Sequence, residues 1–502
     1  MKNIFFIIGV LFYAHCAAQI RFSKQYISDS TNWLSSIRSV NQLNDTVYLA
    51  LIGIYKSSNE ESLLIVKVDQ NGNLVWKKDY HLRESITPVE ITPTKDNNFI
   101  ISGGRTIINN GLRTLLPFLF KINQQGDSIW YKEYTSEKEW SIASFLTETS
   151  DGGFVTCGYT VKWLKSGTDY KEQPWQAYVL RTDSLGNLLW KYEYGDFSHS
   201  EVAQCVVELP NQDLIVVGRS LSHVKGENFD IDLLTIRIDK DGQGKWFKKY
   251  GQRGLNESFT KITSSRGSLY LVSGGFSSPA PNANHGGILA KMDENGNMQW
   301  LKKLNSEVEG LDFSGGHVEL ANGDITVTGV NYKDYDVGIA QFDSTGAFKW
   351  LRRHDLNPNS DESIYGIIHT LDNGFAIFGH GLSPIRKNDQ AWLLKLDQYG
   401  CDTEVCAKSV VTSDMPVSEV GQLIAYPNPS NGLAWVRWDI DEGLAHAVLT
   451  ISDMSGVLVK SVPIMTATGE YDLDALDLAD GMYIATLRSG GRSVVAKFVV
   501  VQ

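Results

Sequence analysis

The 502-residue sequence predicts an all-β protein in which seven four-stranded units close into a ring, followed by a small C-terminal β-sandwich. Three observations predict this fold. The first is a recurrent turn-and-Trp motif, and the second is a recurrent Asp/Asn/Gly turn that opens a β-prone apolar run. The third is the pentapeptide "FSKQY" at Phe22–Tyr26, which looks like the end of a unit with no unit before it.

The turn-and-Trp motif consists of an apolar run, Asp (Asn in one copy), two residues, Gly, three residues and Trp. A further copy, "LDQYG" at Leu396–Gly400, stops at Cys401 before any Trp. The copies recur every 50–60 residues or so, which is the spacing of propeller blades. The six complete copies end at Trp76, Trp130, Trp190, Trp246, Trp300 and Trp350.

The second motif also occurs seven times, for example as "TSDGGFVTCG" from Thr149 and "LPNQDLIVVG" from Leu209. Both motifs are typical of β-hairpins, because Asp, Asn and Gly form the tight turn between two β-prone runs. Two hairpins per interval give four strands. Seven such units without helical periodicity predict a seven-bladed β-propeller. An eight-bladed ring and an open β array are the alternatives, and the two independent counts both favour seven.

The orphan pentapeptide completes the ring. The seventh unit lacks its last strand after Gly400, and "FSKQY" places Phe22 where the repeat has Trp and Tyr26 where it has Tyr. We therefore expect this N-terminal strand to pair with the strand Trp392–Asp397, since closure covers edges that would otherwise be exposed. Chance similarity of five residues is the alternative.

The first residues, "MKNIFFIIGVLFYAHCAAQ", have one Lys, an apolar run and then small residues. This pattern predicts a signal peptide at residues 1–18, cleaved after Ala18. Lipidation at Cys16 is disfavoured because His15 replaces the small residue that a lipobox needs. No other segment has the apolar length of a transmembrane helix. The mature protein is therefore expected to be exported.

Charge and cysteines narrow the function classes further. The formal charge is −12 and Lys/Arg runs are absent, which disfavours nucleic acid and anionic lipid as partners. Cys401 and Cys406 predict a disulfide in an exported protein. Zinc is less favoured, since no second pair lies nearby. Cys157 and Cys205 lie in apolar runs and are expected to be buried free thiols. No cofactor and no metal is predicted.

After the propeller (19–406) and a polar linker (407–423), residues 424–502 alternate like the strands of a small Ig-like β-sandwich. This tail resembles the type A C-terminal sorting domain of the Bacteroidetes type IX secretion system. That resemblance implies a type IX secretion machinery partner, removal of the tail, and release or attachment at the cell surface. The matching residues are Pro427, Asn428, Pro429, Gly456, Gly481, Tyr483 and Lys497.

The repeats resemble arrays common in secreted proteins of the same bacteria, for which no general catalytic role is implied. No nucleophile, zinc-protease or P-loop motif occurs. Turns such as "DQNGN" resemble calcium-loop beginnings, but they lack the later Glu of an EF-hand. An acid also recurs before the innermost strand. It predicts either a calcium-binding ring or, as we favour, contacts at blade junctions: Glu84, Glu139, Glu201, Glu257, Glu362 and, close to register, Asp312.

Residues that break the repeat are the better candidates for function. The third-blade connection is the longest and is rich in aromatic residues, which suit stacking on a sugar or a protein surface. A loop mini-core is the alternative role. The predicted ligand-binding residues are Trp163, Tyr170, Trp175, Trp140 and Trp33, with His223, His285 and His380 in the same class of loop.

Two functions therefore stay open. The first is an exported propeller that binds a glycan or a surface protein. The second is an extracellular hydrolase or lyase with its active site on the long-loop face. The enzyme would need two or three carboxylates or histidines converging on one pocket.

Overall fold

The computed structural model divides into two compact units, Met1–Thr412 and Ser413–Gln502. The predicted signal peptide, Trp33 and the linker up to residue 420 lie outside the described residues. The described residues are 21–26, 34–57, 60–80, 85–109, 112–134, 139–166, 169–172, 174–195, 198–222, 230–278, 284–305, 308, 310–331, 335–354, 362–382, 389–402, 421–426, 433–440, 447–453, 458–464, 466, 468–474, 478–479, 481–489 and 492–500.

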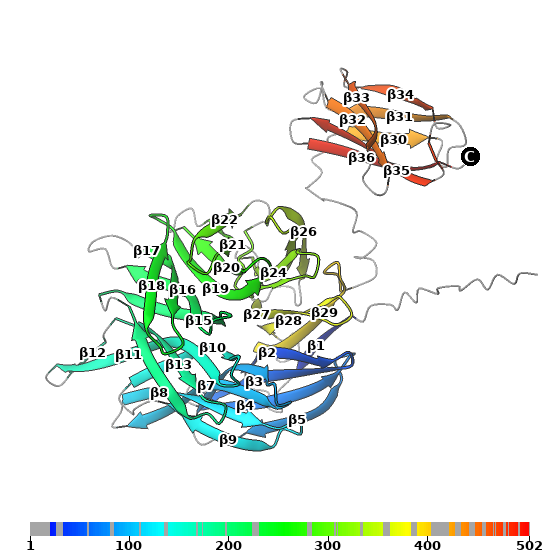
Figure 1. Ribbon diagram of the computed structural model, residues 1–502. Coiled ribbons are helices and arrows are strands. Elements are labelled where there is room, and N and C mark those ends of the chain that lie inside the picture. The colour runs from blue at the N-terminus through cyan, green and yellow to red at the C-terminus, as the bar shows by residue number, and fades with distance from the viewer. Residues whose placement is uncertain are drawn as a thin grey trace, which may run out of the picture. The chain divides into compact units, whose positions relative to one another are not determined.

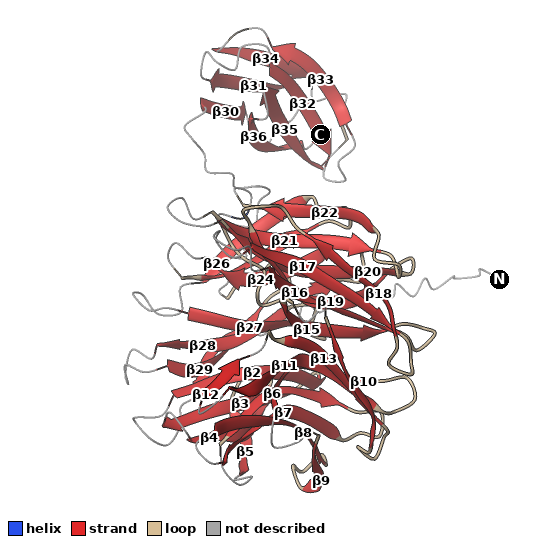
Figure 2. Ribbon diagram, turned by 90° about the vertical axis from the view of Figure 1, so that its left-hand side faces the viewer, coloured by secondary structure: helices blue, strands red, loops and turns tan. Residues whose placement is uncertain are grey.

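The N-terminal unit consists of consecutive antiparallel repeats of four strands (Figures 1 and 2). Repeats 1 to 4 comprise β2 (Leu34–Asn44), β3 (Val47–Ser57), β4 (Glu60–Asp69) and β5 (Leu74–Tyr80); β6 (Ile86–Pro93), β7 (Phe99–Asn109), β8 (Leu112–Ile122) and β9 (Ser128–Glu133); β10 (Glu139–Glu148), β11 (Phe154–Ser166), β13 (Gln176–Thr182) and β14 (Leu188–Tyr194); and β15 (Ser200–Glu208), β16 (Leu214–Ser222), β17 (Asp230–Ile238) and β18 (Gly244–Tyr250).

Repeats 5 to 7 follow the same order. They comprise β19 (Asn256–Ser265), β20 (Leu269–Ser277), β21 (His285–Met292) and β22 (Met298–Leu304); β23 (His317–Glu319), β24 (Ile325–Val330), β25 (Val337–Phe342) and β26 (Phe348–His354); and β27 (Glu362–His369), β28 (Phe375–Leu382) and β29 (Asp389–Leu396), with β1 (Phe22–Tyr26) as the fourth strand.

The predicted all-β class is confirmed, since the described residues contain no α-helix. In each repeat the four strands lie side by side in chain order. One residue pair, Ile231 with Asn256, also joins the sheets of repeats 4 and 5. Because neighbouring strands are antiparallel, the turns after the first and third strands share one end of each sheet, the turn end. The remaining connections lie at the opposite end, the connection end.

Repeat 7 confirms the predicted pairing of the N-terminal pentapeptide. β1 is hydrogen-bonded to β29, with Phe22 opposite Lys395 and Tyr26 opposite Ala391. Arg21 extends the contact by donating to Asp397 Oδ2 from Nη2 at 2.6 Å and from Nε at 3.2 Å. A strand from the start of the chain therefore completes the sheet formed by residues 362–396.

The Trp of the turn-and-Trp motif and the Tyr four residues after it link each repeat to the next. In repeat 2, the hydroxyl of Tyr134 donates to the carbonyl of Gly186 in the next turn at 2.8 Å. The ring of Trp130 packs on the same Gly186, whose φ of 75° is the left-handed conformation that glycine adopts without strain. Hydrogen bonds from the same position of other repeats join Tyr26 to Gly72, Tyr80 to Gly126, Tyr194 to Gly242, Tyr250 to Gly296, and His354 to Gly400.

The remaining junction, from repeat 5 to repeat 6, has Leu304 at the Tyr position. There Lys302 Nζ donates to the Gly346 carbonyl at 2.8 Å, and Trp300 packs on Gly346. Each repeat from 1 to 6 thus contacts the turn glycine of the following repeat. Tyr26, in the last strand of repeat 7, contacts Gly72 in repeat 1 in the same way. Each of these hydrogen bonds is expected to contribute about 1 kcal/mol to the free energy of unfolding, so the junctions stabilise the unit together.

The C-terminal unit contains two sheets that share one apolar core. Val436 and Trp438 contribute from one sheet, and Leu449, Ala485 and Phe498 from the other. The first sheet has the order β30 (Gly421–Tyr426), β31 (Leu433–Ile440), β34 (Thr468–Asp474); the second has the order β33 (Leu458–Ile464), β32 (Ala447–Asp453), β35 (Gly481–Ser489), β36 (Arg492–Val500).

Candidate functional site

The first strands of the repeats lie toward the middle of the N-terminal unit, while strands such as β5 and β9 lie toward its rim (Figure 1). Six of these first strands have a β-bulge at the equivalent position, where one residue has no partner in the register. A bulge re-aims the side chains around it, and bulges often border functional sites. The bulge residues differ between repeats: Arg38, Val89, Ser144, Gln204, Thr260 and Tyr365.

Three residues that directly follow bulges, Ser39, Glu90 and Lys261, interact across repeats 1, 2 and 5. Ser39 Oγ donates to Glu90 Oε1, and Glu90 lies close enough to Lys261 for the charge of each to shift the pKa of the other. Burial raises the pKa of Glu90 to about 7, although the Ser39 hydroxyl and Lys261 oppose the rise. Burial lowers the pKa of Lys261. This pair crosses the middle of the unit from β6 to β19.

His317 and Cys205 complete this interior cluster. The imidazole is fully buried, and Nδ1 and Nε2 each lie 2.8 Å from a hydroxyl, those of Ser273 and Thr263. Burial, reinforced by the charge of Lys261, holds the pKa of His317 well below its usual range, so the ring is neutral near pH 7. Burial also raises the pKa of Cys205 to about 11, and a protonated thiol is a poor nucleophile.

A second cluster lies at the connection end, where repeat 7 meets repeat 1. The Arg38 guanidinium lies 4.5 Å from the ring centroid of Tyr365 and 5.7 Å from that of Tyr55, and its Nη2 donates to the Tyr55 hydroxyl. The ring of His380 lies 5.6 Å from that of Tyr365. Tyr365 is 38% exposed, so solvent reaches this stack. We call Arg38, Tyr55, Tyr365 and His380 the stacked cluster.

Asp389 sets the electrostatics of His380, because its Oδ2 lies 3.8 Å from His380 Nε2. Burial lowers the pKa of His380, the carboxylate of Asp389 opposes that shift, and the Arg38 charge adds to it. His380 was predicted as a loop residue, and the structure places it inside β28. His285 lies at the start of β21, and His223 lies outside the described residues.

The predicted aromatic residues of repeat 3 fall into two groups. The Trp175 ring stacks on Tyr159 with centroids 4.9 Å apart, and the backbone N–H of Trp175 donates to Ser200 Oγ at 3.0 Å. Trp140 is partly buried, and its indole N–H is buried without an acceptor among the described residues. These two residues therefore pack into the body of the unit, which is the alternative role considered for them.

Trp163 and Tyr170 lie on an unexpected feature. The predicted connection is instead a two-stranded ribbon, because β11 continues to Ser166 and pairs with β12 (Asp169–Glu172). Figure 1 shows this ribbon extending away from the rest of the N-terminal unit. Trp163 is opposite Glu172 and Lys165 is opposite Tyr170. These register positions share one face of the ribbon, since strand positions alternate between faces.

The recurrent acids are used inside their own repeats. Glu201 Oε1 accepts a bond from Lys249 at 3.2 Å, and Glu257 Oε1 lies 2.7 Å from Lys303 Nζ. Asp312 accepts the backbone N–H of Val330 at 3.0 Å. Glu362 is also buried, while nothing is described for Glu84 or for the side chain of Glu139. Within the described residues, no group of three or more His, Cys, Asp or Glu is placed to hold a metal ion.

The Asp residues of the turns bond their own turn backbones. Asp69 Oδ1 accepts the N–H groups of Asn71 and Asn73 at 2.9 and 2.8 Å. Asp293 repeats this arrangement with Asn295 and Asn297, both at 2.8 Å. The resemblance of these turns to calcium loops thus reflects hairpin geometry.

Cys157 and Cys205 are buried free thiols, as the sequence predicts. Cys401 is disulfide-bonded, and its predicted partner Cys406 lies outside the described residues.

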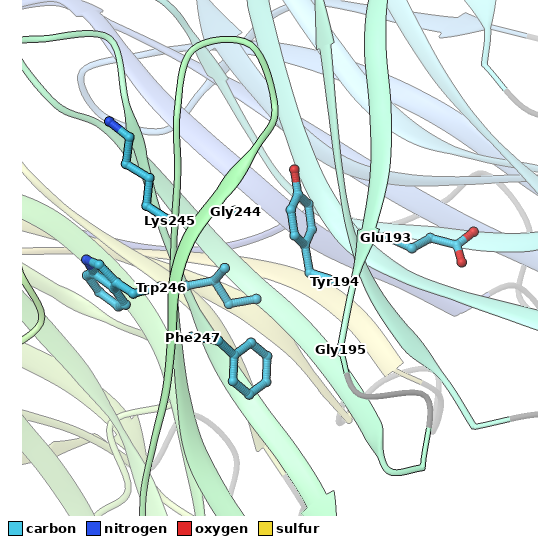
Figure 3. A pocket seen from close by; sticks show the side chains of 8 residues that line it. Glu193, Tyr194, Gly195, Gly244, Lys245, Trp246 and Phe247 are labelled. Carbon is cyan, nitrogen blue, oxygen red and sulfur yellow. The ribbon is translucent and has the colours of Figure 1, made fainter.

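Grooves lie between the outer strands of neighbouring repeats, at equivalent positions of the repeated structure. One groove of about 360 Å³ lies between β14 and β18 and is lined by Tyr194, Lys245 and Trp246 (Figure 3). A second lies at the equivalent place between β9 and β14, lined by Lys132, Tyr134 and Leu188. Because the grooves occupy equivalent positions, neither marks a special repeat.

Sequence reasoning missed Arg38, Glu90, Lys261 and Tyr365, although a signal for such positions exists. Five of the six bulge residues lie fourteen residues before a Gly of the second motif, as Tyr365 does before Gly379 and Thr260 before Gly274, whereas Arg38 lies fifteen residues before Gly53. Aligning the repeats on that Gly therefore locates the bulge positions to within one residue. The residues at these positions and next to them differ between repeats.

The sorting-motif residues are only partly described. Gly481 and Tyr483 lie in β35 and Lys497 in β36, whereas Pro427, Asn428, Pro429 and Gly456 lie outside the described residues. The Tyr483 ring stacks on Phe498 at 5.7 Å, and its hydroxyl donates to the Ala479 carbonyl at 2.9 Å.

Residues 424–501 match the family described as the secretion system C-terminal sorting domain. This domain marks proteins for export by the type IX secretion system. The protein is exported to the cell surface or the extracellular space. The sorting domain also implies a contact with the secretion machinery. None of the described residues form a helix with the length and apolarity needed to cross a membrane.

Similar solved structures include the acylaminoacyl peptidase of Pyrococcus horikoshii (12% identity, TM-score 0.41, 82% of this chain and 59% of that chain) and a puromycin hydrolase mutant (11%, 0.39, 80% and 58%). Sqt1 of Chaetomium thermophilum is similar at 12% identity and TM-score 0.38, over 72% of this chain and 83% of that chain. The chain thus spans less than two thirds of both enzymes. These likenesses are too distant to bear on activity. No curated protein matches the chain.

Proposed function

We propose that the N-terminal unit is a seven-bladed β-propeller that binds a glycan or protein ligand outside the cell, and that the C-terminal unit is an Ig-like β-sandwich that directs its export. The proposed division is a signal peptide at 1–18, the propeller at 19–406, a linker at 407–423 and the sorting domain at 424–502. In the mature protein the proposed disulfide joins Cys401 to Cys406.

The propeller proposal is supported by the head-to-tail contacts between repeats. Each repeat packs its aromatic residue on the turn glycine of the next, and the last contact, from β1 of repeat 7, returns to Gly72 of repeat 1. An open array would leave one junction without such a contact. A ring also accounts for the proximity of Glu90 in repeat 2 to Lys261 in repeat 5.

One observation carries the binding proposal: polar residues that recur are used in structural contacts, whereas residues that vary gather at the first strands and at the connection end. The recurrent acids pair with lysines such as Lys249 and Lys303. The varying residues include the stacked cluster and the β11–β12 ribbon with Trp163 and Tyr170. Variation of this kind on a regular scaffold is typical of a binding surface.

The hydrolase or lyase alternative has less support. It requires acids or histidines that converge with suitable protonation on one pocket. Among the described residues, Glu201 and Glu257 are engaged by lysines, and burial keeps the thiol of Cys205 protonated. His380 and Asp389 lie together, but the Tyr365 ring also lies beside the imidazole, with centroids 5.6 Å apart.

Glycan and protein arrays probed with the secreted protein test the proposal. We expect selective binding that weakens when Trp163 is replaced with Ala, because truncating a central aromatic anchor costs about 2 kcal/mol or more, roughly thirtyfold in affinity. Trp190→Ala, a change in a recurrent Trp that donates to the Lys240 carbonyl, should instead lower stability and serves as the control. Hydrolysis of an array component by the wild type would favour the enzyme alternative.

A further inference from the structure

Within the described part of the chain, Arg38 lacks the carboxylate partner that the buried cations of the third strands have. The third strand of most repeats carries a buried cation that pairs with a carboxylate of a nearby turn. Examples are Arg181 with Asp151 at 2.9 Å, Arg237 with Asp213 at 2.9 Å and Lys395 with Asp372 at 2.9 Å. Among the described residues no carboxylate lies within ion-pair distance of Arg38, whose contacts are aromatic rings and one phenol hydroxyl.

The stack fixes the Arg38 guanidinium without neutralising it. The Tyr55 and Tyr365 rings hold the guanidinium, and only Nη2 has an acceptor, the Tyr55 hydroxyl. Its Nε is buried and has no hydrogen-bond partner among the described residues. A preorganised guanidinium whose charge is not compensated by contact is the arrangement that binds a carboxylate, often through two hydrogen bonds.

The position of the cluster makes it specific to one place in the fold. Arg38 and Tyr365 are the bulge residues of β2 and β27, which belong to the two repeats joined by ring closure. The other bulge residues, such as Val89, Ser144 and Thr260, are neither basic nor aromatic. The cluster is therefore not a by-product of the repeat, and Tyr365 leaves it open to solvent.

We propose that the stacked cluster binds the carboxylate of an acidic saccharide, with Arg38 as the anchor. This inference rests on the proposed binding function and names its ligand class. One fixed guanidinium beside partly exposed aromatic side chains matches one carboxylate on one sugar ring. An acidic protein partner would need a broad basic surface, which a chain of formal charge −12 does not favour. Asp389 faces His380, so the ligand carboxylate belongs on the Arg38 side.

Calorimetric titration of the secreted protein with three oligosaccharides tests this assignment. The probes are hexagalacturonate, its methyl ester, which keeps the sugar but removes the charge, and neutral cellohexaose. We expect binding of hexagalacturonate alone, weakened by added salt. Arg38→Gln should reduce the affinity by roughly ten- to thirtyfold. Arg266→Gln provides the matched control, since Arg266 is exposed in a turn at the opposite end.

Arg38→Lys separates charge from stacking, because it keeps the cation but loses the planar group, and we expect an intermediate affinity. It also serves if Arg38→Gln does not fold. Equal affinities for the acid and its methyl ester, or an unchanged affinity of Arg38→Gln, would overturn the assignment. Binding of cellohexaose alone would also overturn it while leaving the proposed binding function intact. Failure of all three probes would overturn it too, and the arrays would then decide the binding function separately.

Discussion

The contact between Arg21 and Asp397 offers a direct test of ring closure. Arg21 precedes β1, and its guanidinium donates twice to a carboxylate at the end of β29. The same carboxylate accepts the N–H groups of Tyr399 and Cys401 through Oδ1 at 2.8 and 2.9 Å. One buried acid therefore joins the first strand of the chain to the last turn of the ring. Arg21→Gln removes the cation and leaves the turn contacts in place.

The expected cost follows from burial. The side chain of Asp397 is 1% exposed and that of Arg21 is 17% exposed. Removing one partner of a fully buried ion pair costs about 3–5 kcal/mol. Because water reaches Arg21 and Gln keeps an N–H donor, we expect a smaller loss, about 2 kcal/mol. That corresponds to a roughly thirtyfold increase in the population of the open closure strand.

Hydrogen exchange measured by mass spectrometry shows which strands lose stability in the variant. In Arg21→Gln, amides of β1 and β29 should exchange about thirtyfold faster, while those of β16 and β17, in repeat 4, should be unchanged. Arg266→Gln is the matched control, because Arg266 is an exposed arginine in a turn of repeat 5, away from the closure strand.

Two results would refute this reasoning. If exchange in β1 and β29 stays at the wild-type rate, the ion pair does not hold the closure strand. If exchange rises equally in all repeats, the ring opens only by global unfolding and closure is not a local event. Either outcome would also weaken the expectation that removing β1 exposes an edge prone to aggregation.

Three further predictions concern other parts of the chain. Because burial raises the pKa of Glu90 to about 7 from its usual 4.5, the folded state retains a proton there that the unfolded chain releases. The stability from Glu90 is thus present below about pH 4.5 and lost by pH 7, so Glu90→Gln should flatten the pH profile of unfolding by up to about 3 kcal/mol; identical profiles would contradict this. A chain ending near Gln422 should fold its N-terminal unit, with the unfolding temperature of that unit unchanged, but fail to leave the cell; normal secretion would refute the sorting role. Peptide mapping without reductant should find Cys401 linked to Cys406, and a free Cys406 would reject that pairing.

The sequence was informative about the fold because the structural contacts repeat. The turn glycine, the Trp and the Tyr of the first motif are the groups that join neighbouring repeats, so each junction leaves the same pattern in the chain. The pentapeptide Phe22–Tyr26 could be assigned to the last repeat because it retained the aromatic positions of that pattern. Phe22 and Tyr26 use those positions to contact Gly72 of repeat 1, while the strand pairs with β29.

The candidate site left no such pattern. Arg38 and Tyr365 each lie in a β-prone strand, and although the spacing to the second-motif Gly locates a bulge, it does not show which bulge residues meet. They meet because β-bulges re-aim them and because the ring brings repeat 7 against repeat 1. The β11–β12 ribbon was missed for a different reason. Only four residue pairs form it, Trp163–Ser166 with Asp169–Glu172, so the sequence of the segment is typical of a long loop.

The stacked cluster and ring closure are physically linked. Arg38 and Tyr365 belong to repeats 1 and 7, far apart in the chain, and β1 completes the sheet of repeat 7 while Tyr26 bonds to Gly72 of repeat 1. Any loosening of that junction removes the aromatic face from the guanidinium. Arg21→Gln should therefore weaken hexagalacturonate binding although Arg21 is not part of the cluster. The loss should shrink in Arg38→Gln, since that variant has already lost the anchor, so the two changes should combine less than additively. Fully additive losses would show that closure and binding are independent.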